Sequence, residues 1–169
     1  LDSSEVSNPP EWFEDAFRLA REAGLHTVAH AAEEGPPQYI TNAVKALEAE
    51  RIDHGVGCDG DPGVVEMLVR NQIPLTMCPL SNVKLNVFDR IEDHNLKRLL
   101  DLGIKVTVNS DDPAYFGGYV LDNYLAVADG LDLTREDIVQ LSRNSIEASF
   151  MPDVDKDLLL VELETVSGQ

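Results

Sequence analysis

Ionisable side chains of the kinds that bind metals and move protons occur at separate points along the chain. His30 is followed three residues later by Glu33, and His54, Asp111 and Asp112 come further along. Neutral imidazole nitrogens and a carboxylate oxygen are the ligands that a catalytic zinc ion prefers, and such sites leave one position for water. A second carboxyl group and a second imidazole nearby can act as general acid and general base. Together these residue types predict metal-assisted hydrolysis.

Each of these residues alone has an ordinary structural interpretation. A lone histidine such as His30 is more often hydrogen-bonded in a core than bound to a metal. Glu33 could favour the positive end of a following helix, and the Asp-Asp-Pro sequence at 111–113 is typical of a plain turn. Cys58 and Cys78 have no histidine at a recognised ligand spacing, so we expect them to be buried thiols. Only the combination predicts chemistry.

The apolar pattern predicts elements that would bring these residues to one edge of a sheet. Short apolar segments alternate with amphipathic ones, and this alternation predicts parallel strands joined by right-handed crossovers. In such folds the chemistry lies at the carboxyl ends of the strands, where His30, His54, Cys78 and Asp111 fall. A polar loop is expected after Cys78. The predicted strands are 25–29, 51–55, 73–78 and 104–108, and the predicted helices are 9–23, 36–50, one starting at 61, one around 96–102, 120–128, 134–149 and 155–164.

Composition restricts the class of function. The chain has 13 Lys and Arg residues against 31 Asp and Glu residues, a net charge of −18, so we expect neither nucleic-acid nor membrane-surface partners. No apolar run approaches the ~18 residues that cross a bilayer. With two cysteines and no export signal, a cytoplasmic location is expected.

Four motifs, in their order and spacing, resemble the adenosine/adenine deaminase family. They are TVAHAAE at 27–33, RIDHG at 51–55, CPLSNVKL at 78–85 and VNSDDP at 108–113. The resemblance covers essentially the whole chain, and it is closest to the adenine deaminase branch, which acts on the free base. It implies an α/β fold, the TIM-type (β/α)8 barrel, in which parallel strands alternate with helices.

The resemblance also implies a role for each candidate residue. His30 and Asp111 match zinc ligands, and Glu33 matches the residue that protonates the purine ring nitrogen. His54 matches the residue that helps activate the attacking water, and Asp112 matches a substrate contact. The implied reaction replaces the 6-amino group of adenine with oxygen and releases hypoxanthine and ammonia, with Zn²⁺ and no organic cofactor.

The chain also departs from the family. Barrels of this type have about 250 residues, whereas this chain has 169 and matches the C-terminal half, so the first-strand His-x-His that supplies two more zinc ligands has no counterpart. His26 cannot replace it, since it would lie about 13 Å from His30 along a strand, and we expect His94 at the surface. Ala32 stands where the family usually has glycine.

Residues 1–169 are therefore expected to form a single incomplete (β/α) barrel domain. Four strands leave two open parallel edges and an uncovered apolar interior, so we expect a homo-oligomer or association with a missing N-terminal half rather than a lone monomer. Two alternatives stay open: adenosine as the substrate, or a non-catalytic fragment or interaction module that keeps the motifs.

Overall fold

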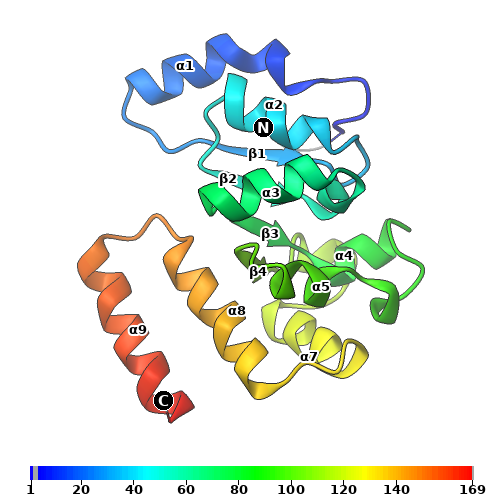
Figure 1. Cartoon of the computed structure of the whole chain (residues 1–169), viewed down its shortest axis with the longest axis vertical. Coiled ribbons are helices and arrows are strands. Elements are labelled where there is room, and N and C mark those ends of the chain that lie inside the picture. The colour runs from blue at the N-terminus through cyan, green and yellow to red at the C-terminus, as the bar shows by residue number, and fades with distance from the viewer. Residues whose placement is uncertain (2–3, 169) are drawn as a thin grey trace. The chain divides into compact units, whose positions relative to one another are not determined.

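The chain forms two compact units in a computed structural model that describes residues 1 and 4–168. The first unit contains Leu1–Met77 and Arg98–Lys105, and the second contains Cys78–Lys97 and Val106–Gln169. Figure 1 follows the chain through its elements by colour. No helix among the described residues combines the length and the apolar character needed to cross a membrane. The single incomplete barrel domain over residues 1–169 stays a prediction.

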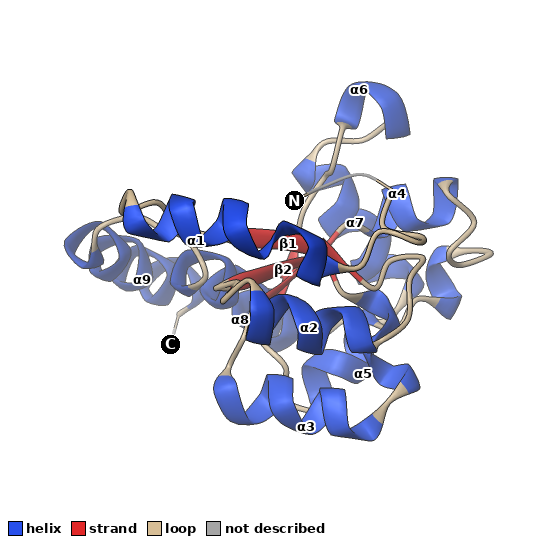
Figure 2. Cartoon of the chain, turned by 90° about the horizontal axis from the view of Figure 1, so that it is seen from above, coloured by secondary structure: helices blue, strands red, loops and turns tan. Residues whose placement is uncertain are grey.

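A parallel sheet forms the centre of the first unit. Strand β1 (Val28–Ala31) pairs in parallel with β2 (Arg51–His54), which pairs in parallel with β3 (Leu75–Met77). Ala31 lies opposite His54, so the carboxyl ends of β1 and β2 coincide, as the side-by-side strands in Figure 2 show. Along each strand, half-buried side chains alternate with buried ones, of which Ala29, Ala31, Ile52, Leu75 and Met77 are fully buried.

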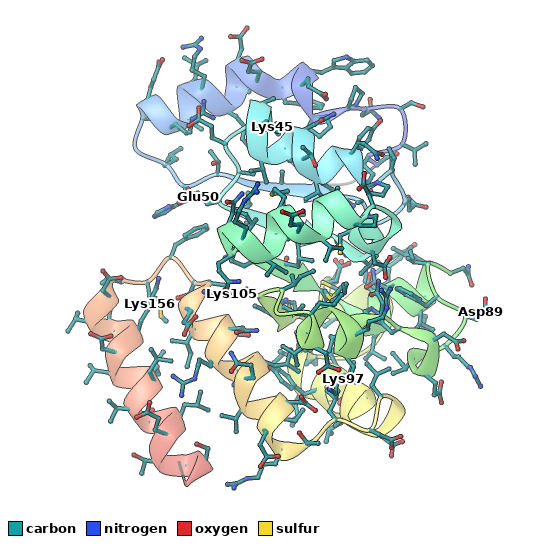
Figure 3. The ribbon with its side chains drawn as sticks, viewed as in Figure 1. Lys45, Glu50, Asp89, Lys97, Lys105 and Lys156 are labelled. Carbon is teal, nitrogen blue, oxygen red and sulfur yellow. The ribbon has the colours of Figure 1, made fainter. Side chains whose placement is uncertain are left out.

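Helices separate these strands, as the sequence predicts. Asp61 caps α3 by accepting a hydrogen bond from Gly63 N at 2.8 Å, and Pro62 takes the first helical position. His26 precedes β1 and pairs with Glu50, which Figure 3 labels, at 2.9 Å. The remaining elements here are the 3-10 helices Pro10–Phe13 and Val56–Gly60, α1 (Glu14–Glu22), α2 (Gln38–Ala46), α3 (Pro62–Asn71) and α5 (Leu96–Asp101), which the unit boundary divides.

The second unit places helices against one short strand, β4 (Val106–Val108). Helix α8 (Arg135–Glu147) packs against this strand, and its Asn144 Nδ2 donates a buried hydrogen bond to Val106 O at 2.8 Å. Thr134 caps α8 in a capping box with Asp137. The other elements of this unit are α4 (Pro79–Lys84), the 3-10 helix Ile91–Asp93, α6 (Pro113–Phe116), α7 (Val120–Gly130), α8 (Arg135–Glu147) and α9 (Asp153–Ser167).

The structure confirms the prediction of parallel strands that alternate with helices. It has short helices in two places where the sequence predicts a loop or a turn. A polar loop was predicted after Cys78, but α4 begins there with Pro79 in its first turn. A plain turn at 111–113 is one interpretation of that sequence, but Asp112 caps the short helix α6, which also begins with a proline. Both helices are missed because a proline at the first helical position resembles the proline of a turn.

His94 is buried, so the predicted surface position is wrong. Its side chain lies against Phe88, with ring centroids 4.4 Å apart. Nδ1 accepts a hydrogen bond from Leu96 N at 3.1 Å, and Nε2 lies 3.2 Å from Asn82 Oδ1. Only the neutral ring with its proton on Nε2 satisfies both partners, because a protonated Nδ1 would face a backbone N–H. Burial lowers the pKa of His94 to about 4.

Because the pKa of His94 is low in the folded chain, we expect the protein to lose stability in mild acid. In the unfolded chain its pKa returns to 6.5, so between pH 6.5 and about 4 the unfolded state binds more protons and the free energy of unfolding falls as pH falls. The separation of the two pKa values corresponds to about 3 kcal/mol. Thermal unfolding midpoints between pH 7.5 and 4.5 measure it. His94→Gln should flatten the dependence of the unfolding midpoint on pH. His26→Gln, at an exposed position, should leave that dependence unchanged. Parallel curves for the wild type and His94→Gln would show that His94 is not the cause.

Candidate active site

Three of the predicted site residues meet at the carboxyl ends of β1 and β2. Glu33 lies between two imidazoles, with Oε2 at 3.4 Å from His30 Nε2 and Oε1 at 3.1 Å from His54 Nδ1. The two imidazole rings have centroids 4.4 Å apart. The side chains of His30, Glu33 and His54 are 12%, 5% and 8% exposed, so this carboxylate is held out of bulk water. The structure therefore brings these three residues together.

Two residues in or beside this cluster have a strained backbone conformation. Ala32 and His54 have φ angles of +58° and +61°, in the left-handed region that costs a residue with a side chain about 1–2 kcal/mol. Such positions concentrate at functional sites. Gly57 N donates to Ala32 O at 2.8 Å, and a Cβ on Gly57 would lie 3.0 Å from that oxygen. The positive φ explains why glycine suits position 32, and here the surrounding contacts hold an alanine in the same conformation.

The surroundings of His30 favour the neutral form of its ring. Burial is the largest influence on the pKa of His30 and lowers it, and the neighbouring His54 lowers it further, against the opposing effect of Glu33 and Glu5. A metal binds the neutral imidazole. Ligand atoms of His30, Glu33 and His54 lie within 4.8 Å of one another, so this donor set of two imidazoles and a carboxylate fits a divalent metal such as zinc.

Sequence reasoning missed Glu5, which belongs to the same site. Its carboxylate is 5% exposed and accepts hydrogen bonds from the backbone N–H groups of four consecutive residues, 32–35. Glu5 Oε1 also lies 3.7 Å from His30 Nε2. No spacing rule connects Glu5 with a loop that lies 27 residues further along the chain. The only available signal is that an acidic side chain near the start of the chain has no cationic neighbour in the sequence.

The second unit holds the two predicted aspartates. Asp111 follows β4 with a φ of +58°, and its Oδ2 accepts a hydrogen bond from the fully buried Ser81 Oγ at 2.6 Å. Asp112 Oδ1 accepts from Ala114 N and Tyr115 N, and so caps α6. The capping role is structural, and the substrate contact of Asp112 stays a prediction. The sharing of one ion by His30 and Asp111 also stays a prediction.

The hydrogen bond from Ser81 predicts a measurable effect on metal binding. Ser81→Ala removes the partner that orients Asp111 Oδ2, and loss of such an outer contact costs about 10–100-fold in metal affinity. Competition with a fluorescent zinc chelator measures this. Ser142→Ala is the matched control, because that hydroxyl bonds to Ile138 O in its own helix. Equal affinities of the Ser81→Ala variant and the wild type would contradict a role for Asp111 as ligand.

The two cysteines are buried thiols, as predicted. Both are free. Burial raises the pKa of Cys58 to about 12, so this thiol stays protonated and unreactive near neutral pH.

Comparisons with known proteins relate this chain to the adenosine deaminase family. The family model described as adenosine deaminase matches residues 1–166. A curated adenine deaminase from Hahella chejuensis is 56% identical over 164 residues, which are 97% of this chain and 49% of that protein. One from Cupriavidus necator is 54% identical over 164 residues, covering 97% of this chain and 47% of that protein. The chain thus spans about half the length of these relatives.

Solved structures show the same fold. The crystal structure of adenine deaminase from Arthrobacter aurescens matches all of this chain and 52% of its own, with 50% identity and a TM-score of 0.98. An amidohydrolase from Burkholderia ambifaria, crystallised with bound Zn, is 27% identical with a TM-score of 0.91, over 99% of this chain and 47% of its own. These likenesses confirm the α/β fold class and half of a TIM-type (β/α)8 barrel.

Proposed function

Because this chain belongs to the adenosine deaminase family, we propose that the protein carrying it deaminates adenine hydrolytically. Water and adenine would give hypoxanthine and ammonia. The observation that carries this proposal is the buried Glu33 carboxylate between the imidazoles of His30 and His54. The names of the relatives, which are adenine deaminases, favour the free base over adenosine as the substrate.

Glu33 and His54 would share the proton transfers. A protonated Glu33 would donate a hydrogen bond and then a proton to a ring nitrogen of the purine, which makes C6 more electrophilic. His54 would accept a proton from the attacking water as the C6–O bond forms. As the C6–N bond breaks, His54 would return its proton to the amino group, which leaves as ammonia, and the C6 hydroxyl would lose its proton to Glu33. Their separation of 3.1 Å allows the two groups to exchange a proton directly. Asp112 would contact the purine.

His30 and Asp111 would hold Zn²⁺. Zinc, when bound, supplies a Lewis acid that lowers the pKa of water towards ~7. A structural relative with bound Zn and the largely buried imidazole of His30 near the end of β1 support this assignment. The chain has no counterpart of the first-strand His-x-His, so we propose that residues outside this sequence complete the ligand set. Association with an N-terminal half or with a second copy would supply them.

The same evidence supports proposals on partners and location. A small purine is the proposed partner, and the net charge of −18 disfavours nucleic acid and anionic membranes. Two cysteines in 169 residues do not indicate a disulfide framework, so we propose the cytoplasm.

An assay on the full-length protein that carries this sequence tests the proposal. We expect one zinc per active site by mass spectrometry of metals, and faster ammonia release from adenine than from adenosine. Faster ammonia release from adenosine would show that adenosine, and not adenine, is the preferred substrate. Absence of both zinc and turnover would favour a non-catalytic module that keeps the inherited motifs.

A further inference from the structure

The backbone around the site encloses a carboxylate that the proposed reaction does not use. Glu5 Oε2 accepts from Ala32 N at 2.6 Å, and Oε1 accepts from the N–H groups of Glu33, Glu34 and Gly35 at 2.6, 2.7 and 2.9 Å. The four N–H groups converge because the chain passes through the left-handed Ala32. Successive N–H groups in such a conformation form a concave anion site. Here the chain itself supplies the anion, and we call this arrangement the Glu5 cradle.

The cradle is matched to its occupant in shape as well as charge. A Cβ on Gly35 would lie 2.7 Å from Glu5 Oε2 and 3.0 Å from Glu5 Cδ. Any side chain at position 35 would therefore displace the carboxylate. Hydrogen bonds to an ionised acceptor are shorter and about twice as strong as neutral ones. Two distances of 2.6 Å, to Ala32 N and Glu33 N, fit that class.

Leu1, four residues before Glu5, is hydrogen-bonded to β1. Leu1 N donates to Val28 O at 3.3 Å, and His30 N donates to Leu1 O at 3.0 Å. The chain therefore runs beside β1 at Leu1, and Glu5 reaches over the end of that strand. The Glu5 carboxylate bonds to the loop in which the Glu33 side chain begins.

We propose that Glu5 is a positioning residue, whose carboxylate holds the 32–35 loop and thereby keeps the Glu33 carboxyl between His30 and His54. This inference rests on the proposed deamination for the part that Glu33 plays. Glu5 bonds to the backbone of the loop, whereas Glu33 is the residue proposed to contact the substrate. A displacement of about 1 Å of a catalytic group can cost about 10²-fold in rate.

Three substitutions separate the charge of Glu5 from its reach. Glu5→Gln keeps the length but places an NH2 group against at least one N–H donor of the cradle. Glu5→Asp keeps the charge but withdraws the carboxylate by one methylene. Gly35→Ala leaves Glu5 intact and fills its place. Glu11→Gln, at an exposed position on the 3-10 helix Pro10–Phe13, removes the same charge away from the loop and serves as control.

The experiment compares hydrogen exchange, zinc content and kinetics in the full-length protein. We expect Glu5→Gln, Glu5→Asp and Gly35→Ala to accelerate exchange of the amides of 32–35 by about 10-fold or more. We expect kcat for adenine to fall by about 10–100-fold, while KM changes less than kcat and zinc content stays at the wild-type level. Glu11→Gln should match the wild type in every measurement.

The outcomes distinguish this inference from the proposed function. Unchanged exchange at 32–35 in a folded Glu5→Gln variant would overturn the cradle, and faster exchange with unchanged kcat would overturn the positioning role. Loss of zinc together with activity would assign the effect to His30 instead of Glu33. If the wild-type protein deaminates neither purine, the proposed function fails, and the exchange comparison still decides whether Glu5 holds the loop.

Discussion

Replacing Glu33 with glutamine is expected to lower the rate of ammonia release from adenine by about 10³-fold, within the range that a general acid contributes. Glutamine keeps the size of the side chain and its contact with His54, which lies 3.1 Å away. The amide cannot deliver a proton to the purine, so the loss should appear in kcat. Zinc content should stay at the wild-type level, because Glu33 is proposed to move protons and His30 to bind the metal.

A matched control separates this effect from the loss of one charge. Glu66→Gln removes a carboxylate on α3 that is 77% exposed and 3.8 Å from Arg70, so its turnover should equal that of the wild type. Steady-state ammonia release and the thermal unfolding midpoint of both variants complete the comparison. A Glu33→Gln variant that turns over adenine at more than a tenth of the wild-type rate would remove Glu33 from the proton transfer.

The second large effect that we expect is a fall in zinc affinity when a proposed metal ligand is removed. His30→Ala and Asp111→Ala are each expected to weaken zinc binding by more than about 10²-fold, which exceeds the loss from removing an outer contact. Each removes one proposed donor from the same ion. Equilibrium competition with a zinc chelator measures affinity even where the variants have no activity.

Asp112→Ala serves as the neighbouring control for Asp111→Ala. It removes a carboxylate one residue away that caps α6 through Ala114 N and Tyr115 N. We expect wild-type zinc affinity and a raised KM for adenine, because Asp112 is the proposed substrate contact. If Asp112→Ala loses zinc and Asp111→Ala keeps it, the assignment of the two aspartates is reversed.

The strands, and the residues grouped at their carboxyl ends, could be predicted from the sequence for a physical reason. Buried parallel strands are short apolar runs, and the alternation with amphipathic helices places residues that follow each run at one edge. That logic correctly brings His30 and Glu33 beside His54. It places the first strand too early, at 25–29, because the apolar Leu25 directly follows the glycine that ends the first helix, whereas β1 is Val28–Ala31.

Contacts between distant segments could not be predicted in the same way. Glu5 acts through backbone N–H groups, which every residue except proline carries, so no residue type marks its partners. His94 is buried by Phe88 and by hydrogen bonds to Asn82 and Leu96, in a stretch whose polar composition predicts exposure. Local periodicity describes one element at a time, whereas these residues depend on how loops fold back onto the elements.

The most direct test of the account is a crystal structure of the zinc-loaded full-length protein with anomalous diffraction at the zinc edge. We predict one strong peak about 2 Å from an imidazole nitrogen of His30 and from a carboxylate oxygen of Asp111, with Glu33 beside it and unligated. A peak bound to only one of these two residues, or at a different site, would contradict the shared metal centre on which the proposed deamination depends.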